Sequence, residues 1–322
     1  MARLYLFRGF LARRIGGGAE NWPRSRAAIV RQGTAGAVEW RALSHALRID
    51  AADGRPLAAR LFPAGRPRAA VAVASAMGVP QRHYAAFAEW LAKGGFTALT
   101  FDYRGVGGSA VALRGDRATL HEWGEQDLEG ALRFLARRLP GLPRLLVAHS
   151  VGGQIAGLAP ESEKLAGLVF VASSNGWWGH FRGPARAALI AAWYAGLPLL
   201  TCALGYAPLS LIGGEDLPAG IAREWVAWGR RREYVLSYAR DRPAACYGRI
   251  TAPLLSFAFT DDGYAPVAGV AAMTAAYPRA RATLREVRPE DAGGPVGHFG
   301  FFRERFKATL WRETAAFLGA AR

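Results

Sequence analysis

The chain has 322 residues, of which 51% are hydrophobic and 20% charged. This balance excludes a disordered protein and allows one large domain with an insertion, or two smaller domains. The formal net charge at pH 7 is +16, but nearly all of the basic residues are arginines scattered along the sequence. Because no helix-turn-helix, zinc or RNA-binding motif accompanies them, we expect no nucleic-acid partner.

The cysteine count and the apolar stretches bear on compartment and membrane attachment. Cys202 and Cys246 are the only cysteines, too few for a disulfide framework or a cysteine-rich metal site, which favours a reducing cytoplasm. Residues 187–214 carry no charge and are long enough to cross a membrane. Glycine and proline residues interrupt this stretch, so we expect a lid and no stable membrane span.

Residues 1–40 are rich in arginine and follow neither a helical nor an alternating apolar pattern. Arginines interrupt the apolar core that a secretory signal would need. We therefore expect a disordered N-terminal extension that takes no part in the fold.

From residue 41 onward, strands and helices alternate. Strands are predicted at 44–50, 57–62, 69–76, 96–101, 145–148, 165–172, 254–259 and 282–287, and helices at 82–92, 122–138, 267–276 and 302–318. An Asp-Gly turn at Asp53 joins the first two strands into a hairpin. The alternation predicts a mostly parallel sheet covered by helices on both faces.

The alternation stops between the strands at 165–172 and 254–259. This block is rich in tryptophan, and Asp216 and Pro218 are placed to start a helix within it. We expect a first core part at 41–174, a helical cap at 175–249, and a second core part at 250–322. Each cap tryptophan either packs the cap onto the body or lines a substrate pocket; the five candidates are Trp177, Trp178, Trp193, Trp225 and Trp228.

Residues 147–153, Val-Ala-His-Ser-Val-Gly-Gly, join an apolar strand to a small-residue helix start. A serine at such a turn is typical of the nucleophile elbow, Gly-x-Ser-x-Gly, in which Ala148 here takes the place of the first glycine. The alternative interpretation of Ser150 is an ordinary loop serine that caps the next helix.

A serine nucleophile needs a base and a group that orients the base. His149 adjoins Ser150 and is expected to point away from the reaction. His298 lies in a glycine-flanked loop after the last predicted strand, where it either reaches the edge of the sheet or lies on the surface. Asp261 and Asp262 directly follow a buried strand, so either can orient the histidine. The chain order Ser, Asp, His is that of the α/β-hydrolase fold.

From about residue 43 the chain resembles the α/β-hydrolases, and among them the serine aminopeptidase and monoacylglycerol-lipase-like branch. Residues 102–109, Asp-Tyr-Arg-Gly-Val-Gly-Gly-Ser, are similar to the D-x-R-G-x-G-x-S stretch of that branch. Residues 297–303, Gly-His-Phe-Gly-Phe-Phe-Arg, and 214–218, Gly-Glu-Asp-Leu-Pro, resemble a group of bacterial hydrolases.

This resemblance implies an α/β-hydrolase fold with a helical cap inserted between two core strands. It favours Asp262 over Asp261, because the acid of the family usually lies four residues before a proline, here Pro266. It also implies an oxyanion hole made by the backbone N–H groups of Val151 and Met77. Ser75 and Ala76 stand where the family usually has His-Gly, which puts the geometry at Met77 in question.

The sequence thus predicts a serine hydrolase that cleaves an ester or related acyl bond of a small apolar or aromatic molecule. Ser150 would be the nucleophile, His298 the base and Asp262 the orienting acid, with no metal or organic cofactor. Two alternatives stay open: an acyltransferase with the same three residues, and a non-catalytic ligand-binding protein of the same fold. The oligomeric state stays open as well.

Overall fold

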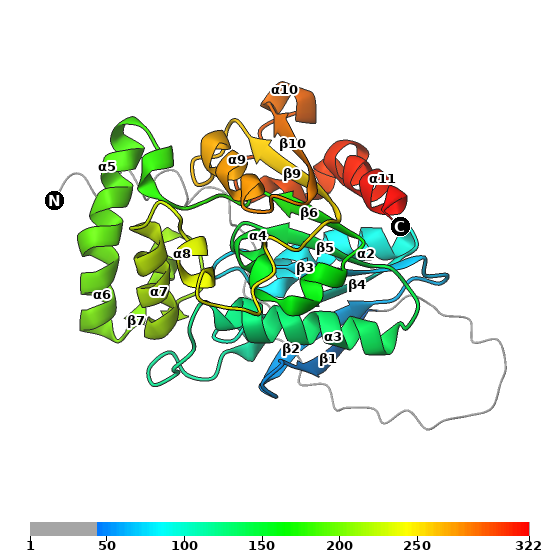
Figure 1. Ribbon diagram of the computed structural model, residues 1–322, viewed down its shortest axis with the longest axis horizontal. Coiled ribbons are helices and arrows are strands. Elements are labelled where there is room, and N and C mark those ends of the chain that lie inside the picture. Colours follow the sequence, from blue (N-terminus) through cyan, green and yellow to red (C-terminus); the bar gives the residue numbers. More distant parts are fainter. Residues whose placement is uncertain (1–43, 322) are drawn as a thin grey trace.

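The computed structural model describes residues 44–321, and among these residues eight strands form one sheet (Figure 1). The strands are β1 (His45–Asp50), β2 (Pro56–Phe62), β3 (Ala69–Ala74), β4 (Phe96–Phe101), β5 (Arg144–His149), β6 (Gly167–Val171), β9 (Pro253–Phe259) and β10 (Arg281–Val287). Their order is β1-β2-β4-β3-β5-β6-β9-β10. β1 and β2 pair antiparallel, as do β2 and β4, and the remaining pairs are parallel. The predicted extension at 1–40 lies outside the described residues.

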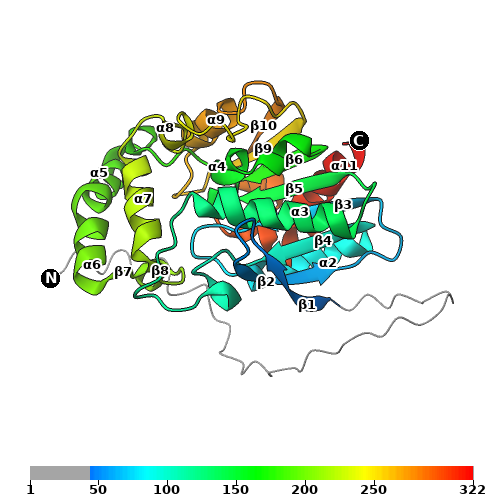
Figure 2. The ribbon, with the colours of Figure 1, turned by 60° about the horizontal axis from the view of Figure 1, so that its bottom comes forward.

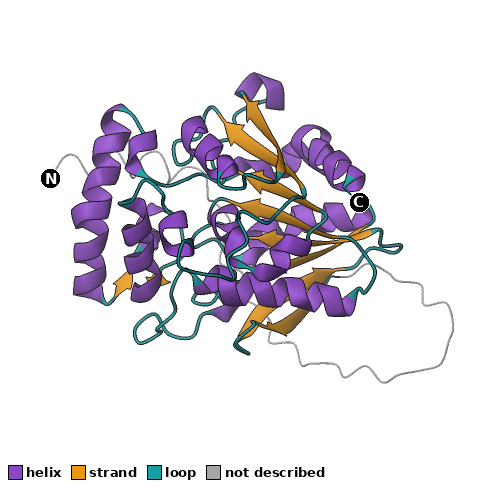
Figure 3. Ribbon diagram, in the orientation of Figure 1, coloured by secondary structure: helices purple, strands orange, loops and turns teal. Residues whose placement is uncertain are grey.

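Helices cover both faces of this sheet (Figure 3). The core helices are α2 (Ala85–Lys93), α3 (Glu129–Arg138), α4 (Val151–Ile155), α9 (Val267–Ala275), α10 (Pro289–Ala292) and α11 (Arg312–Ala320). Apolar residues of α3 and α4 pack in one core cluster, and those of α2 and α11 pack in a second. β3 and β4 are buried along their whole length, as expected for central parallel strands. The predicted fold class is confirmed.

The helices predicted at 122–138 and 302–318 are α-helical only in their second parts, because the π-helical segments Trp123–Leu128 and Lys307–Trp311 come first. Short turns at Gly300–Phe302, Glu304–Phe306 and Lys307–Trp311 precede α11. Phe301 and Phe302 are both buried in the second core cluster. The chain turns more tightly than an α-helix at Gly300–Phe302 and Glu304–Phe306, and more widely at Lys307–Trp311.

Between β6 and β9 the chain leaves the sheet, and residues 175–249 are called the insert below. The insert contains α5 (Gly183–Ala191), α6 (Leu197–Leu204), α7 (Ala219–Gly229) and α8 (Leu236–Ala239). It also contains the short antiparallel pair β7 (Tyr206–Ala207) and β8 (Leu217–Pro218), which the sequence did not predict. α7 lies between the outer helices α5 and α6 and the sheet (Figures 1 and 2).

The outer helices of the insert are apolar and exposed. In the described part of the chain, Gly183–Leu204 is the one helical stretch whose length and composition would allow it to cross a membrane. Its mean hydropathy is 1.8 over a window of which 11% is buried. Tyr194, Leu199 and Leu200 are among its exposed side chains. The expectation of a lid, with no stable span, stays a prediction.

Candidate active site

Ser150 lies at a sharp turn between β5 and α4. Its backbone has φ 53° and ψ −113°, a conformation that non-glycine residues seldom adopt. A Cβ on Gly152 would lie 2.8 Å from the carbonyl oxygen of Ala74, and one on Gly153 would collide with Ser173. The two glycines therefore let α4 approach β3 and the end of β6 closely enough to hold the turn.

The structure brings His298 and Asp262 to Ser150. His298 Nε2 lies 3.0 Å from Ser150 Oγ, and His298 Nδ1 lies 2.7 Å from Asp262 Oδ2. The side chain of Asp262 has no exposed surface, and its other oxygen accepts the backbone N–H groups of Tyr264 and Ala265 at 2.7 and 3.0 Å. A carboxylate held in this way accepts Nδ1–H, which leaves Nε2 free to accept the Ser150 hydroxyl proton.

Asp261 has a different position and different partners. Its Oδ2 accepts the backbone N–H groups of Val296 and Gly297 at 2.8 and 3.0 Å. These two residues directly precede His298, so Asp261 fixes the loop while Asp262 contacts the imidazole. Of the two carboxylates, Asp262 is the one that contacts His298, and its catalytic role stays a prediction.

The two backbone groups predicted to form an oxyanion hole lie on adjacent elements. Val151 is the first residue of α4, a position whose N–H has no intrahelical acceptor. Met77 follows β3, and its N–H donates to no acceptor in the described part of the chain. Both donors are therefore free, and their role in oxyanion binding stays a prediction.

His149 points away from the serine, as expected, but it is not without partners. Its Nδ1 lies 2.9 Å from Tyr84 Oη, and its Nε2 lies 2.9 Å from the backbone oxygen of His298. Complete burial, and after it the nearby imidazoles of His298 and His83, lower the pKa of His149 well below its usual value. Tyr84 was missed by the sequence analysis, because no spacing pattern connects it to residues 147–153.

The five tryptophans occupy different environments in the insert. Trp193 and Trp228 are buried, and Trp193 packs edge-on against Trp225 with ring centroids 4.7 Å apart. Trp177 and Trp178 are half-buried neighbours with centroids 5.2 Å apart. These contacts are packing contacts, and a role in substrate binding stays a prediction for all five.

Trp225 also connects to α4 through polar contacts. Its indole N–H donates to Tyr234 Oη at 2.9 Å, and that hydroxyl donates to Gln154 Oε1 at 3.2 Å. Gln154 lies on α4 and donates in turn to the backbone oxygen of Ser174. The insert is thus attached to the helix that begins at Ser150.

The stretch 102–109 is held by its two charged side chains. Asp102 accepts the backbone N–H groups of Gln81 and Gly108 at 2.6 and 2.9 Å. Gly107 packs against this carboxylate so closely that a Cβ there would lie 2.6 Å from it. Asp102 therefore ties the loop after β3 to the loop after β4.

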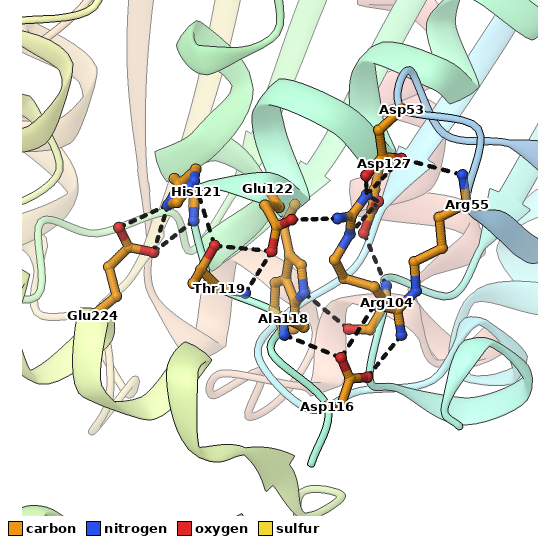
Figure 4. A network of polar contacts seen from close by, with 11 residues as sticks. Asp53, Arg55, Arg104, Asp116, Ala118, Thr119, His121, Glu122, Asp127 and Glu224 are labelled. Atoms are coloured by element: carbon orange, nitrogen blue, oxygen red, sulfur yellow. Dashed lines mark hydrogen bonds and ion pairs between the residues drawn. The ribbon is translucent and has the colours of Figure 1, made fainter. Parts of the chain in front are cut away.

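Arg104 lies at the centre of a buried polar network (Figure 4). Its guanidinium is 2% exposed and contacts Asp127 at 2.7 Å, Glu122 at 2.6 Å and Asp53 at 3.0 Å. Burial raises the pKa of Asp127 to about 6, against the opposing effect of Arg104.

The same network reaches the insert through His121. Its Nδ1 lies 2.9 Å from Glu224 Oε1, and Glu224 lies on α7 (Figure 4). Burial disfavours the charged imidazole, but the hydrogen bond and the charge of Glu224 outweigh it and raise the pKa of His121.

The described residues contain no group of three or more His, Cys, Asp or Glu side chains that could hold a metal ion. The predicted absence of a metal and of an organic cofactor stays an expectation.

Residues 65–217 match the family described as serine aminopeptidase, S33. No curated protein matches the chain.

Solved structures share the fold at low sequence identity. The esterase Pf2001 of Pyrococcus furiosus has a TM-score of 0.54 at 16% identity, over 89% of this chain and 96% of that one. Est1E of Butyrivibrio proteoclasticus, solved with ferulic acid bound, has a TM-score of 0.59 at 19% identity, over 85% and 98%. A lipase in an open form has a TM-score of 0.58 at 18% identity, over 87% and 99%. With its sheet order, its strained serine turn and its match over residues 65–217, the chain has the α/β-hydrolase fold.

Proposed function

We propose that this protein is a serine hydrolase that cleaves an ester or related acyl bond through an acyl-enzyme intermediate. The observation that carries the proposal is the hydrogen-bonded series Ser150 Oγ, His298 and Asp262, with distances of 3.0 and 2.7 Å. A surface loop histidine or a simple capping serine would not require a fully buried carboxylate behind the imidazole.

In the acylation step Ser150 Oγ attacks the substrate carbonyl carbon while its proton passes to His298 Nε2. The resulting imidazolium is stabilised by the carboxylate of Asp262, which stays ionised. When the tetrahedral intermediate collapses, the bond to the leaving alkoxide breaks, and that oxygen takes the proton from Nε2. The acyl group is then bonded to Ser150.

Deacylation repeats these steps with water. His298 Nε2 accepts a proton as the water oxygen attacks the acyl carbon, and returns it to Ser150 Oγ as the carboxylic acid leaves. The N–H groups of Val151 and Met77 would stabilise the oxyanion in both steps. Each donor of this kind is worth roughly 100- to 1000-fold in turnover in other serine hydrolases.

The substrate we propose is a small molecule with an apolar or aromatic acyl or alcohol part. The insert supports this because it is aromatic and because α5 and α6 carry few charges. Ferulic acid, the ligand in the related structure of Est1E, is an aromatic acid. Tryptophans of the insert would contact this part of the substrate.

The test uses labelling by a fluorophosphonate probe and turnover of p-nitrophenyl esters of increasing acyl length. Ser150→Ala should abolish both signals, while Ser162→Ala, a buried serine whose hydroxyl has no partner in the described part of the chain, should keep both. Persistence of labelling in Ser150→Ala would refute the proposal. Product formation that depends strictly on an added alcohol or amine would identify an acyltransferase instead.

A further inference from the structure

A buried imidazole, His149, lies behind the site and is connected to two of its loops, to one directly and to the other through Tyr84. His149 and Tyr84 have no exposed surface. Tyr84 Oη accepts the backbone N–H of Ala76 at 2.8 Å and lies 2.9 Å from His149 Nδ1. On the other side of the ring, His149 Nε2 lies 2.9 Å from the carbonyl oxygen of His298. The side chains of Tyr84 and His149 together thus connect the loop after β3 with the loop that carries the proposed base.

The direction of these hydrogen bonds follows from the chemistry of the partners. A carbonyl oxygen only accepts, so Nε2 of His149 carries the proton and donates to His298. A neutral imidazole then has a bare Nδ1, which accepts the hydroxyl proton of Tyr84. That hydroxyl oxygen in turn accepts the N–H of Ala76. Every donor in the series has one acceptor, so the ring has one tautomer and one orientation.

We propose that His149 is a positioning residue that holds the proposed base loop and the proposed oxyanion loop in register through a hydrogen-bonded series with Tyr84. This inference rests on the proposed function. In this role His149 contacts neither the substrate nor the reacting atoms. It acts on the backbone of His298 directly and on the backbone of Ala76 through Tyr84.

The position of each contact explains how such a residue could affect turnover. Ala76 directly precedes Met77, whose N–H is the proposed second oxyanion donor. A shift of the Ala76 peptide would move that donor away from the oxyanion. The other contact is on the backbone of His298 itself, so losing it would change the position of Nε2 relative to Ser150. Misplacement of reacting groups by about 1 Å can lower a rate by roughly 100-fold.

Aromatic packing around the series keeps it in place and gives a role to the segment 297–303. Phe302 packs edge-on against Tyr84 with ring centroids 4.6 Å apart, and its ring is 5.1 Å from that of His149. The ring of Phe299 lies edge-on to that of His149 with centroids 5.8 Å apart. The rings exclude water from the imidazole, so its two hydrogen bonds have no solvent substitute.

The first set of variants removes polar atoms from equally buried side chains and compares the effects on kcat and KM. His149→Phe keeps a ring but removes both hydrogen bonds, and Tyr84→Phe removes one hydroxyl. Tyr103→Phe is the matched control, because Tyr103 is equally buried and its hydroxyl has no partner in the described part of the chain. We expect kcat for p-nitrophenyl esters to fall by about 10- to 100-fold in His149→Phe with KM within about twofold. Tyr103→Phe should keep both constants.

The double variant tests whether the two side chains act as one unit. Because Ala76 is linked to His149 through the hydroxyl of Tyr84, Tyr84→Phe should lower kcat by a smaller factor in the His149→Phe background than in the wild type. If the two effects multiply, the residues contribute independently to packing and the inference is wrong. It is also wrong if His149→Phe keeps kcat within about twofold of the wild type.

Two conservative variants test the two hydrogen bonds of His149 one at a time. His149→Asn offers an oxygen near the place of Nδ1 and can restore the contact with Tyr84, whereas His149→Gln offers an N–H near the place of Nε2 and can restore the contact with His298. Each should recover part of the kcat that His149→Phe loses. A purely steric role would instead rank the variants by side-chain volume, with His149→Phe the most active.

A measurement that needs no turnover separates failure of this inference from failure of the proposed function. If the wild type neither hydrolyses esters nor reacts with the fluorophosphonate, the proposed function is wrong, and NMR of the imidazole nitrogens still tests the series. His149 should show the Nε2–H tautomer, and the ring signals of His298 should move in His149→Phe but not in Tyr103→Phe. Unmoved His298 signals in His149→Phe would overturn the inference.

Discussion

Two regions of this protein differ in how their side chains are used: the serine site at the edge of the sheet, and the outer helices of the insert. At the site, the side chain of Asp262 has no exposed surface and its two oxygens accept three hydrogen bonds. In the outer helices, Leu199 is 68% exposed and Tyr194 is 52% exposed. The first region is polar and buried, and the second is apolar and exposed.

Folding constrains the buried polar side chains of the site more strongly than the exposed apolar side chains of the outer helices. A buried carboxylate or imidazole is costly unless every partner is present, so the site admits one arrangement of its polar groups. An exposed leucine loses little water on folding and contributes little to stability. The buried polar groups of the site therefore need their hydrogen-bond partners when the chain folds. Folding of the isolated chain does not explain in the same way why Gly183–Leu204 is apolar.

The largest effect is expected from neutralising the buried carboxylate of the site. Asp262→Asn should lower kcat by roughly 1000- to 10,000-fold, because an amide favours the wrong tautomer of His298. Asp261→Asn is the matched control: it keeps an acceptor for Val296 and Gly297 and should cost less than about tenfold. Steady-state turnover of a p-nitrophenyl ester measures both. A larger loss in Asp261→Asn than in Asp262→Asn would show that Asp261, and not Asp262, orients the histidine.

The next effect is on stability and concerns the buried network around Arg104. Arg104→Met removes the cation that faces the fully buried Asp127 and should lower the free energy of unfolding by about 3–5 kcal/mol. Lys93→Met is the control, since Lys93 and Glu89 form an ion pair in which both side chains are exposed, and it should cost at most about 0.5 kcal/mol. Urea unfolding followed by circular dichroism compares the two. Equal losses would mean that the network contributes no more than a surface pair.

The strands that precede the site residues could be predicted from the sequence, for a physical reason. β5 and β9 are short apolar runs, and a parallel sheet brings the residues that follow them to one edge. Ser150 and Asp262 lie just beyond predicted strands and His298 lies in the loop region after the last one, so the order of the elements predicted that they lie close together. The bounds of β4 were predicted to the residue, because Gly94 and Gly95 stop the preceding helix and Asp102 begins a loop.

Partners that lie within the fold could not be predicted in this way. Tyr84 contacts His149 across 65 positions of the sequence, and Arg104 contacts Asp53 across 51. Neither pair follows a helical or strand period, because side chains that meet between elements are fixed by packing in three dimensions. For the same reason the sequence left Asp261 and Asp262 equivalent until a resemblance separated them.

A smaller effect is expected at the contact between the core and α7 of the insert, His121 with Glu224. Because the pKa of His121 is raised in the folded state by Glu224, its stabilisation is fully present below the ordinary value of 6.5 and is lost as pH rises through the raised pKa. The wild type should therefore lose about 0.5–1 kcal/mol between pH 6 and pH 9 that His121→Gln does not lose. Thermal unfolding of both proteins across this range measures the difference. Parallel pH profiles would show that the pair adds nothing to stability.

The smallest effect tests the exposed apolar face directly, with one substitution made in each region. Leu132→Ala, in the fully buried face of α3, should cost about 2–5 kcal/mol because it leaves a cavity. Leu199→Ala removes the same atoms from α6, where most of the side chain already contacts water, and should stay within about 0.5 kcal/mol of the wild type. Urea unfolding gives both values. A cost of several kcal/mol at Leu199 would mean that this helix is covered when the protein is folded in solution, for example by a second copy, and that its exposure does not describe the isolated chain. In that case the unfolding midpoint of the wild type would also rise with protein concentration, because association stabilises the folded state by mass action.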